Sequence, residues 1–582
     1  MNIFKSKLLK KILACLLACV TAFSIACAPP DELLDYTDPN EEIEKPVDEN
    51  KTQLYVTNFE GGVGRVWLDN VIKEFETDYA KYSFAEGKEG VQIHVNQMAN
   101  ASLFADISND SSNVYFFQSI DHLALASKGQ LLDLTDIVTE SLSKITNGEE
   151  TGSIESKLSE DQKLGMKAIN DKYYALPHYE VYEGIVYDID TFEDYGLYIL
   201  EGGGYSEAEA FVDGEYVGQG KLSVGPDGVR GTADDGQPSS YEEFYGLMDR
   251  MVNRGVVPFA FSGFGSVGYL NLLYQAGWTA WEGYDRMRLH YTFNSGDKQV
   301  KTNTVTSFNG NQPVVVEELI TPETAYKLSA QEGKYWPLTI IEKIFSKPEY
   351  RYTGINGTFT NLDAQEEFIR GWLENKPIAM LIEGNYWYNE AAGALTRAEF
   401  AYKDKAKNRR FSMMELPRQA TGQVTEGNVT KNTLHSVLNA QAFINANISM
   451  NEEVKAAALE FLQYCYTNEQ LQKFTVETGV FRGVNYSLTA EQTEKLSIFA
   501  KNVQKVKAKS DVLLPDTNSR LYLNNQSTLN FQLGNRFNSL IEGTLYSVPY
   551  EPFKLGYTAK DYFINSLDSE TSWTTKYGKY FD

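Results

Sequence analysis

A short apolar run late in the chain, Ile378-Ala379-Met380-Leu381-Ile382, constrains the fold more than any other feature. The residues before it place Ala364, Phe368 and Trp372 at helical spacing, and Pro377 ends that helix because proline cannot continue one. A run of this length without a polar residue is typical of a strand that is buried on both faces. Strands of this kind belong to sheets covered by helices, so we expect an α/β fold.

An acid and several aromatic residues follow this strand directly. Glu383 and Gly384 come first, and Tyr386 and Trp387 stand shortly after them. In open α/β sheets ligands bind at the carboxyl ends of the strands, so these residues are candidates for the wall of a pocket. Aromatic residues fill cores more often than they bind ligands, and a core role is the alternative.

Strand-like and helix-like segments also alternate through the first third of the chain. Strands are expected at 54–59, 91–95 and 114–117, and a helix runs through Trp67 and Phe75. Glycines 61, 62 and 64 lie between the first strand and this helix, where they either expose backbone N–H groups to a ligand or form a plain tight turn. Further strands at 184–188 and 256–261 follow an extended segment at Pro177, which suits a hinge between two lobes.

The length and the net charge limit which folds and functions this chain can have. With 582 residues the chain is several times a typical domain, so at least two cores are expected. A net charge of −26 argues against a nucleic-acid-binding role, which requires clustered Lys and Arg. The chain has 5 His and 4 Cys without zinc-ligand spacing, so no cofactor is expected from these residues.

The N-terminus predicts the compartment. Lys5 and Lys10 precede an apolar run, 12–26, that is too short to span a membrane comfortably and ends at Cys27. Ala26-Cys27 is similar to a bacterial lipobox, in which the cysteine is lipidated. Leu16 to Cys19 matches the lipobox letters better but leaves the apolar region too short. We therefore expect a signal peptide at 1–26, and a lipidated Cys27 with a flexible, Pro- and acid-rich tether at 27–50.

An insertion at 211–238 interleaves carboxylates with glycines. Asp227, Asp234 and Asp235 stand on expected tight turns, and oxygen ligands of this kind suit Ca²⁺. The spacing does not match an EF-hand, and an acidic surface turn that binds nothing is the alternative. Structural Ca²⁺ is thus the one cofactor that the sequence suggests, and none is required.

Several segments, taken in order, resemble the extracellular solute-binding lipoproteins of carbohydrate ABC importers, the type that includes the maltose-binding proteins. Those that carry the resemblance are Gly61 to Gly64 with Trp67, Gly129 to Thr135, Tyr174 to Pro177 before Gly184 to Asp188, Ser240 to Phe244, Ala379 to Gly384, Met414 to Pro417, and Ala456 to Thr478-Gly479. They are spread over most of the chain beyond the tether. Family members usually have Gly-x-Trp after the Ala-Met strand, whereas here Tyr386 occupies the place of that Trp and Trp387 follows.

The resemblance implies a two-lobed, periplasmic-binding-protein-like fold of type II with an inserted acidic segment. The expected lobes are 51–178 plus 418–485 and 179–417 plus 486–582, with crossing segments near Pro177 and Pro417. The implied function is capture of an oligosaccharide between the lobes and delivery to an ABC import permease, without catalysis. The protein is expected to be a monomer that is lipid-anchored on the outer face of the cell membrane.

The resemblance also places ligand-binding residues at strand ends and at the hinge. The expected residues are Glu60, Trp67, Gln118, His178, Tyr179, Tyr269, Trp278, Glu383, Tyr386 and Trp387. Tyr386 and Trp387 are expected to stack on sugar faces, and Glu383 to accept hydroxyl hydrogen bonds. Alternatively, Trp67 is a core residue of its helix and His178 packs the hinge.

Two other functions remain open. A secreted glycoside hydrolase needs two carboxylates held across the scissile bond, and acids are abundant in this chain. A binder of peptides or other solutes on the same scaffold is the second alternative.

Overall fold

The computed structural model describes residues 46–98, 107–118, 120–167, 170–264, 266–436, 440–514, 519–525, 529, 540–541, 544–545 and 551–581. The predicted signal peptide, Cys27 and most of the tether lie outside these residues. Residues 44–582 form one compact unit, and all contacts below belong to it.

The first sheet is built mainly from the N-terminal third of the chain. Its strands run in the order β2 (Val91–Met98), β1 (Thr52–Phe59), β3 (Val114–Gln118), β14 (Ala440–Ile444) and β4 (Ala175–Pro177). β1 pairs in parallel with β2 and β3, whereas β14 is antiparallel to β3 and β4. The strands expected at 54–59, 91–95 and 114–117 are therefore confirmed.

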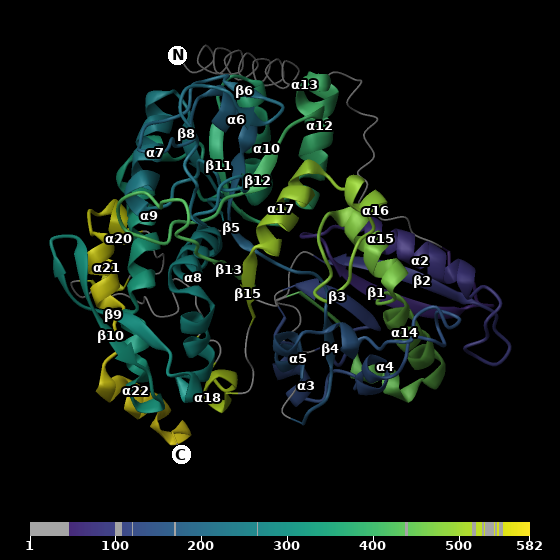
Figure 1. Ribbon diagram of the computed structural model, residues 1–582. Coiled ribbons are helices and arrows are strands. Elements are labelled where there is room, and N and C mark those ends of the chain that lie inside the picture. Colours follow the sequence, from purple (N-terminus) through teal and green to yellow (C-terminus); the bar gives the residue numbers. More distant parts are fainter. Residues whose placement is uncertain are drawn as a thin grey trace, which may run out of the picture. The chain divides into compact units, whose positions relative to one another are not determined.

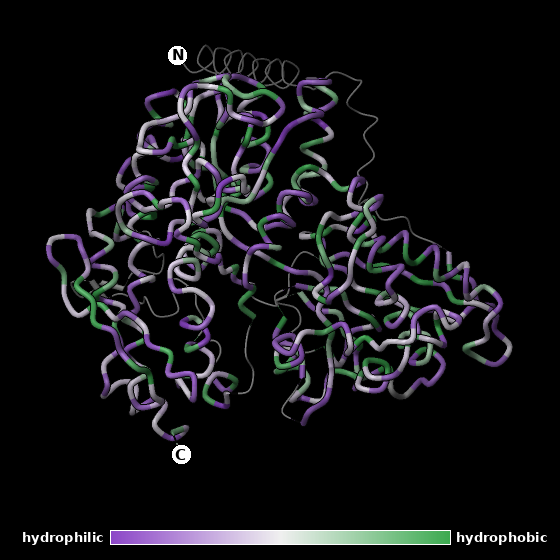
Figure 2. The backbone as a smooth tube through the Cα atoms, viewed as in Figure 1, coloured by the Kyte–Doolittle hydropathy of each residue, from purple (hydrophilic) through white to green (hydrophobic). Residues whose placement is uncertain are grey.

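The second sheet contains the apolar run on which the fold prediction rests. Its order is β12 (Phe411–Met413), β5 (Glu183–Asp188), β11 (Ile378–Gly384) and β8 (Val257–Ala260). Every residue of β11 is buried, as expected for a strand covered on both faces. Figure 2 shows hydrophobic residues along the strands of both sheets.

Helices cover both sheets, and their sequences explain where they lie and end (Figure 1). α2 (Val66–Asp78) buries Trp67, Leu68 and Phe75 along one side, the spacing that packs a helix onto a sheet. α10 (Asn361–Leu373) starts at a capping box between Thr360 and Asp363 and stops before Pro377, as predicted. α8 (Ser266–Thr292) bends at Gly283, whose φ of 74° is non-helical.

The chain passes between the sheets more than once. It leaves β4 at Pro177 and enters β5 at Glu183, and it returns from β12 to β14 through residues 414–439. α14 (Glu452–Tyr464) and α15 (Asn468–Thr478) pack with β1 and α2 of the first sheet, and α17 (Ile498–Ala508) then packs with β12 of the second. The exact lobe boundaries stay a prediction.

The insertion carries a short hairpin, β6 (Phe211–Val212) with β7 (Glu215–Tyr216), followed by a series of turns. Other pairs are β9 (Lys301–Asn309) with β10 (Gln312–Leu319), β13 (Asn432–His435) with β15 (Ser510–Leu513), and β16 (Leu540–Ile541) with β17 (Thr544–Leu545). The remaining α-helices of the described residues are α3 (His122–Ser127), α4 (Thr135–Thr139), α5 (Glu160–Met166), α6 (Ile189–Asp194), α7 (Tyr241–Asn253), α9 (Tyr335–Ser346), α11 (Trp387–Glu390), α12 (Ala392–Tyr402), α13 (Asp404–Lys407), α16 (Ala490–Glu494), α18 (Arg520–Leu523), α20 (Glu551–Lys554), α21 (Ala559–Asn565) and α22 (Glu570–Tyr577).

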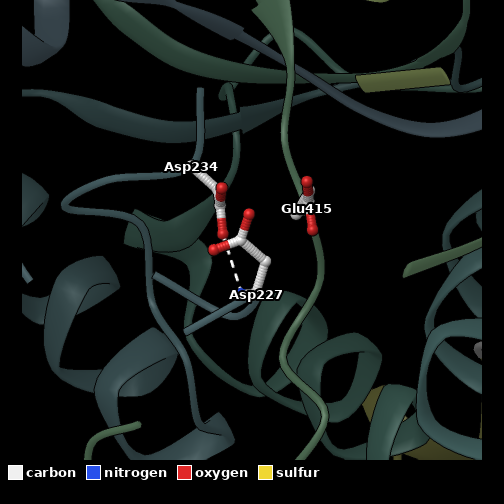
Figure 3. Close-up of side chains that lie close together, drawn as sticks. All are labelled: Asp227, Asp234 and Glu415. Atoms are coloured by element: carbon white, nitrogen blue, oxygen red, sulfur yellow. Dashed lines mark hydrogen bonds between the residues drawn. The ribbon is translucent and has the colours of Figure 1, made fainter. Parts of the chain in front are cut away.

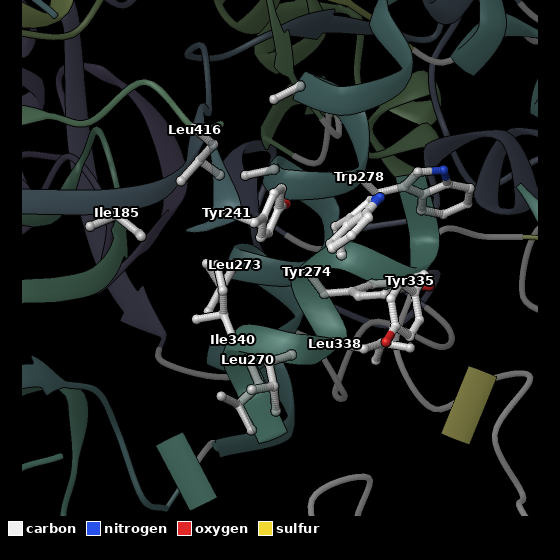
Figure 4. Packing of buried hydrophobic residues seen from close by; sticks show 14 of the residues in the cluster. Ile185, Tyr241, Leu270, Leu273, Tyr274, Trp278, Tyr335, Leu338, Ile340 and Leu416 are labelled. Carbon is white, nitrogen blue, oxygen red and sulfur yellow. The ribbon is translucent and has the colours of Figure 1, made fainter. Parts of the chain in front are cut away.

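Separate hydrophobic cores accompany the two sheets, so the expectation of at least two cores is confirmed. One core surrounds β1, β3 and α2 and includes Trp67 and Phe461. Two others flank the second sheet, and the larger packs α8 against α9 and β5 through residues such as Tyr274 and Leu338 (Figure 4).

Candidate functional site

A polar cluster joins the end of β11 to the turn that follows β1. Glu383 is the penultimate residue of β11, and Glu390 ends the short helix α11. The Gln365 amide nitrogen donates to both carboxyls, at 3.0 Å to Glu383 Oε1 and 3.1 Å to Glu390 Oε2. The backbone N–H of Gly62, in the turn after β1, donates to Glu390 Oε1 at 2.7 Å. Elements of the two sheets thus meet at Glu390.

Position 62 of this turn favours glycine. Its φ is +66°, and an added Cβ would lie 2.2 Å from the Tyr179 hydroxyl oxygen. That hydroxyl in turn donates to the Gln118 side-chain oxygen at the end of β3. The predicted residues Gln118 and Tyr179 therefore lie together beside the Gly62–Glu390 contact.

Tyr269 and Tyr386 complete the cluster from the second sheet. Tyr269, near the start of α8, hydrogen-bonds to Glu383. Tyr386 is 8% exposed and packs into the same core as Tyr179. The structure thus brings together five predicted residues: Gln118, Tyr179, Tyr269, Glu383 and Tyr386.

Burial controls the charge of this cluster. Removal from water, followed by the nearby charge of Glu390, raises the pKa of Glu383 well above its usual range. Burial likewise raises the pKa of Glu390, against the hydrogen bonds from Gly62 and Gln365 that lower it. The pair therefore holds a proton at a pH where exposed glutamates have lost theirs.

The other five predicted residues take no part in these hydrogen bonds among the described residues, although the His178 ring packs against that of Tyr179 with centroids 4.9 Å apart. Trp67 is 3% exposed, with its ring against Phe116 and Phe474, which agrees with the alternative of a helix core residue. His178 is buried, with Nδ1 at 2.9 Å from Arg482 Nη1, and burial lowers its pKa well below the usual value. This position agrees with the alternative in which His178 packs the hinge.

Trp278 also lies in a core, where its indole nitrogen donates to Gln331 Oε1 at 3.0 Å. Glu60 is exposed at the end of β1 and makes no side-chain contact that would connect it to the cluster among the described residues. Neither residue is brought to the cluster.

Trp387 does not form a stacking surface in this structure. Its exposed fraction is 0%, and rings of Phe368, Phe411 and Phe499 pack edge-on around it. Tyr386 and Trp387 point into different cores, so the expected pair of adjacent sugar platforms is not present. Of the two rings, Tyr386 alone belongs to the cluster.

A cavity of about 490 Å³ lies between α3 and α18, shortly after the carboxyl end of β3. Its lining mixes polar and apolar side chains and contains one aromatic ring, that of Tyr174; the lining residues are Asp121, Leu123, Ala124, Ala126, Ser127, Lys167, Asn170, Tyr174, Leu523 and Asn524. The Asn170 amide nitrogen donates to the Tyr174 hydroxyl at 2.8 Å. The volume is that of a site for a small organic ligand.

Sequence reasoning missed Glu390 and most of this lining. Glu390 stands seven positions after Glu383, and a short helix after the strand would have indicated that both carboxyls can lie at the same strand end. The lining residues beyond Tyr174 carry no motif, since small and polar residues on short helices are common in any fold.

The acidic turn of the insertion forms a different group from the predicted one. Asp227 and Asp234 lie with Glu415, from the segment after β12, and one carboxylate oxygen of each lies within 4.8 Å of the others (Figure 3). Asp235 is not part of this group, and its Oδ2 accepts from the Gly231 N–H at 2.8 Å. Burial raises the pKa of Glu415 to about 7, and it raises the pKa of Asp234. The expected trio is corrected to Asp227, Asp234 and Glu415.

No helix in the described part of the chain combines the length and the apolar character needed to cross a membrane. Neither a protein-family model nor a curated protein sequence matches the chain.

Solved structures, in contrast, match most of it. A chitin oligosaccharide binding protein is similar at 14% identity with a TM-score of 0.51, over 88% of this chain and 100% of that one. The maltose-bound MalE3 of T. maritima is similar at 14% identity with a TM-score of 0.50, over 90% of this chain and 100% of that one. The predicted α/β class and the resemblance to solute-binding proteins are therefore confirmed at the level of the fold. The chain has the two-lobed fold of these sugar-binding proteins.

Proposed function

We propose that this protein captures an oligosaccharide outside the cell membrane and delivers it to an ABC import permease. The observation that carries the proposal is the 490 Å³ cavity beside α3, the helix that follows the carboxyl end of β3, in a fold shared with proteins named for binding chitin oligosaccharide and maltose. Ligands of open α/β sheets bind at this end of the strands.

The cavity lining suits a sugar. The half-buried ring of Tyr174 offers an apolar face for the C–H side of a pyranose, and the Asn170 amide can pair with hydroxyls. Asp121 and Lys167 add an acceptor and a donor at the wall. Gln118, Tyr269, Glu383 and Tyr386 are proposed as further hydroxyl and ring partners, which exchange their present mutual contacts for contacts with the sugar.

The first test is a glycan array followed by calorimetry with the tightest ligand. Loss of the ring in Tyr174→Ala is expected to weaken binding about ten- to hundredfold, which corresponds to about 1.5–3 kcal/mol for an apolar side chain that a ligand covers. Glu383→Gln is expected to weaken it as well, because the amide puts an NH₂ group where one carboxyl oxygen of Glu383 stands and so removes an acceptor for the sugar hydroxyls.

Tyr82→Ala is the matched control, since this tyrosine is 47% exposed on the loop before β2 and away from the cavity. It should leave affinity unchanged. If Tyr174→Ala and Glu383→Gln both bind the ligand with wild-type affinity, the site lies elsewhere. If the protein binds members of a peptide panel in preference to glycans, the proposal of a sugar ligand is wrong.

Binding without catalysis is part of the proposal. The carboxyls of Glu383 and Glu390 share the Gln365 amide and are largely buried, rather than facing each other across a hollow as a glycosidase pair must. Mass spectrometry of the ligand after long incubation should show it intact, and cleaved products would favour the hydrolase instead.

We further propose that the protein acts as a monomer that is lipid-anchored at Cys27, on the basis of the basic and apolar residues that precede Ala26-Cys27. Cys27→Ser is expected to move the protein from the membrane fraction to the medium, because a lipid chain supplies the anchor. Labelled fatty acid on Cys19, or on neither cysteine, would contradict this assignment.

A further inference from the structure

Three buried carboxylates from distant parts of the sequence converge beside the insertion. The exposed fractions of Asp227, Asp234 and Glu415 are 6%, 0% and 2%. One oxygen from each lies within 4.8 Å of the other two. Calcium takes oxygen ligands at about 2.3–2.6 Å, so oxygens this close together can all touch one ion. The geometry is that of a partial calcium coordination shell.

Glu415 supplies an independent indication of a cation. Its Oε2 accepts from Arg418, but its Oε1 is buried and has no hydrogen-bond donor among the described residues. A buried carboxylate oxygen without a partner is costly, and native structures pair such atoms with a donor or a metal. The Glu415 carboxyl lies beside Asp227 and Asp234 (Figure 3).

A lysine ammonium already contacts the other two carboxylates. Lys509 Nζ lies 3.1 Å from Asp227 Oδ2 and 3.5 Å from Asp234 Oδ1. Three acids therefore face two cations, Lys509 and Arg418. The Lys509 side chain is 31% exposed and follows the end of α17, so it can turn into solvent. Arg418 compensates the charge of one of the three acids. A divalent ion in the place of Lys509 would balance the negative charge of the other two.

The turn is built to hold these oxygens in place. Asp234 Oδ2 accepts from the Asp227 N–H at 2.9 Å, and Asp227 Oδ1 accepts from the Val229 N–H at 2.7 Å. An added Cβ on Gly225, at φ +62°, would lie 2.1 Å from the Asp234 carbonyl oxygen. The turn therefore packs too closely for any other residue at this position.

We propose that Asp227, Asp234 and Glu415 bind Ca²⁺, and that the ion displaces Lys509 and ties the insertion to the segment after β12. All three side chains are hard oxygen donors, which excludes a soft thiolate or imidazole site. Calcium accepts such irregular all-oxygen sites more readily than magnesium, which demands near-ideal octahedral geometry.

The test is calorimetric titration of the chelator-treated full chain with CaCl₂, together with thermal unfolding in Ca²⁺, in Mg²⁺ and in chelator. A dissociation constant on the order of 0.1–1 mM is expected, as for extracellular calcium modules. Saturating Ca²⁺ should raise the unfolding temperature, since an ion bound to the folded state must stabilise it. Equimolar Mg²⁺ should raise it less.

Two variants separate a calcium site from a lysine-neutralised acidic turn. Glu415→Gln is expected to weaken Ca²⁺ binding at least tenfold, and Lys509→Met to tighten it at least tenfold because the competing ammonium is gone. Asp213→Asn removes one charge at the exposed tip of the β6–β7 hairpin and serves as the matched control with wild-type affinity.

Absence of Ca²⁺ binding in both the wild type and Lys509→Met, with both proteins folded by circular dichroism, overturns the proposal. The proposal is also overturned if Glu415→Gln and Lys509→Met both bind Ca²⁺ with wild-type affinity, because the ion then binds at another place.

Discussion

Replacement of Trp387 by alanine is expected to lower the free energy of unfolding by about 3–5 kcal/mol, the range for deletion of a buried aromatic side chain. The indole is fully buried, and the rings of Phe368, Phe411 and Phe499 surround it. Alanine would leave a cavity that these edge-on rings cannot fill without leaving their own contacts. Urea unfolding followed by circular dichroism measures the loss.

The control for this prediction is Phe400→Ala, which removes an aromatic ring that is 47% exposed and should change stability by less than about 0.5 kcal/mol. Trp387→Phe should fall between the two, because a smaller ring fills part of the space. A stable Trp387→Ala protein that has lost its sugar affinity would restore the stacking role predicted from the sequence and contradict the core role described here.

The contrast between Tyr386 and Trp387 shows where sequence reasoning ends. The strand before them was predictable, because five apolar residues in a row have few alternatives to burial. Beyond Gly384 the chain turns into α11, where consecutive side chains point about 100° apart. Tyr386 therefore reaches the core of the first sheet while Trp387 enters that of the second. No local pattern distinguishes these directions.

The acidic group illustrates a second limit. Asp227 and Asp234 were predictable as neighbours, because a glycine-rich turn brings residues seven positions apart together. Glu415 stands far along the sequence, and only the path of the chain after β12 places it beside them. A ligand contributed by a distant segment is invisible to spacing, since it depends on the tertiary arrangement alone.

Replacement of Arg409 by methionine is also expected to lower the free energy of unfolding by about 3–5 kcal/mol, because it leaves a buried acid without its charged partner. The Arg409 side chain is 2% exposed and that of Asp188 is 0% exposed. Its guanidinium donates to Asp188, to Asp190 Oδ2 at 3.0 Å and to the Ile369 carbonyl at 2.7 Å. Urea unfolding at pH 7 measures the loss.

The pH dependence of this loss identifies Asp188 as its source. Burial raises the pKa of Asp188, and the charge of Arg409 opposes that rise, so Arg409→Met should raise this pKa further. An acid whose pKa is higher in the folded than in the unfolded state loses stability as the pH rises above its unfolded value. The deficit should therefore be smaller near pH 4 than at pH 7, and Asp188→Asn added to Arg409→Met should recover part of it, since asparagine still caps α6.

Arg397→Met, at an exposed ion pair with Glu366, should cost less than about 0.5 kcal/mol. Equal losses at Arg409 and Arg397, or a deficit at Arg409 that does not change with pH, would show that the buried pair does not stabilise this lobe.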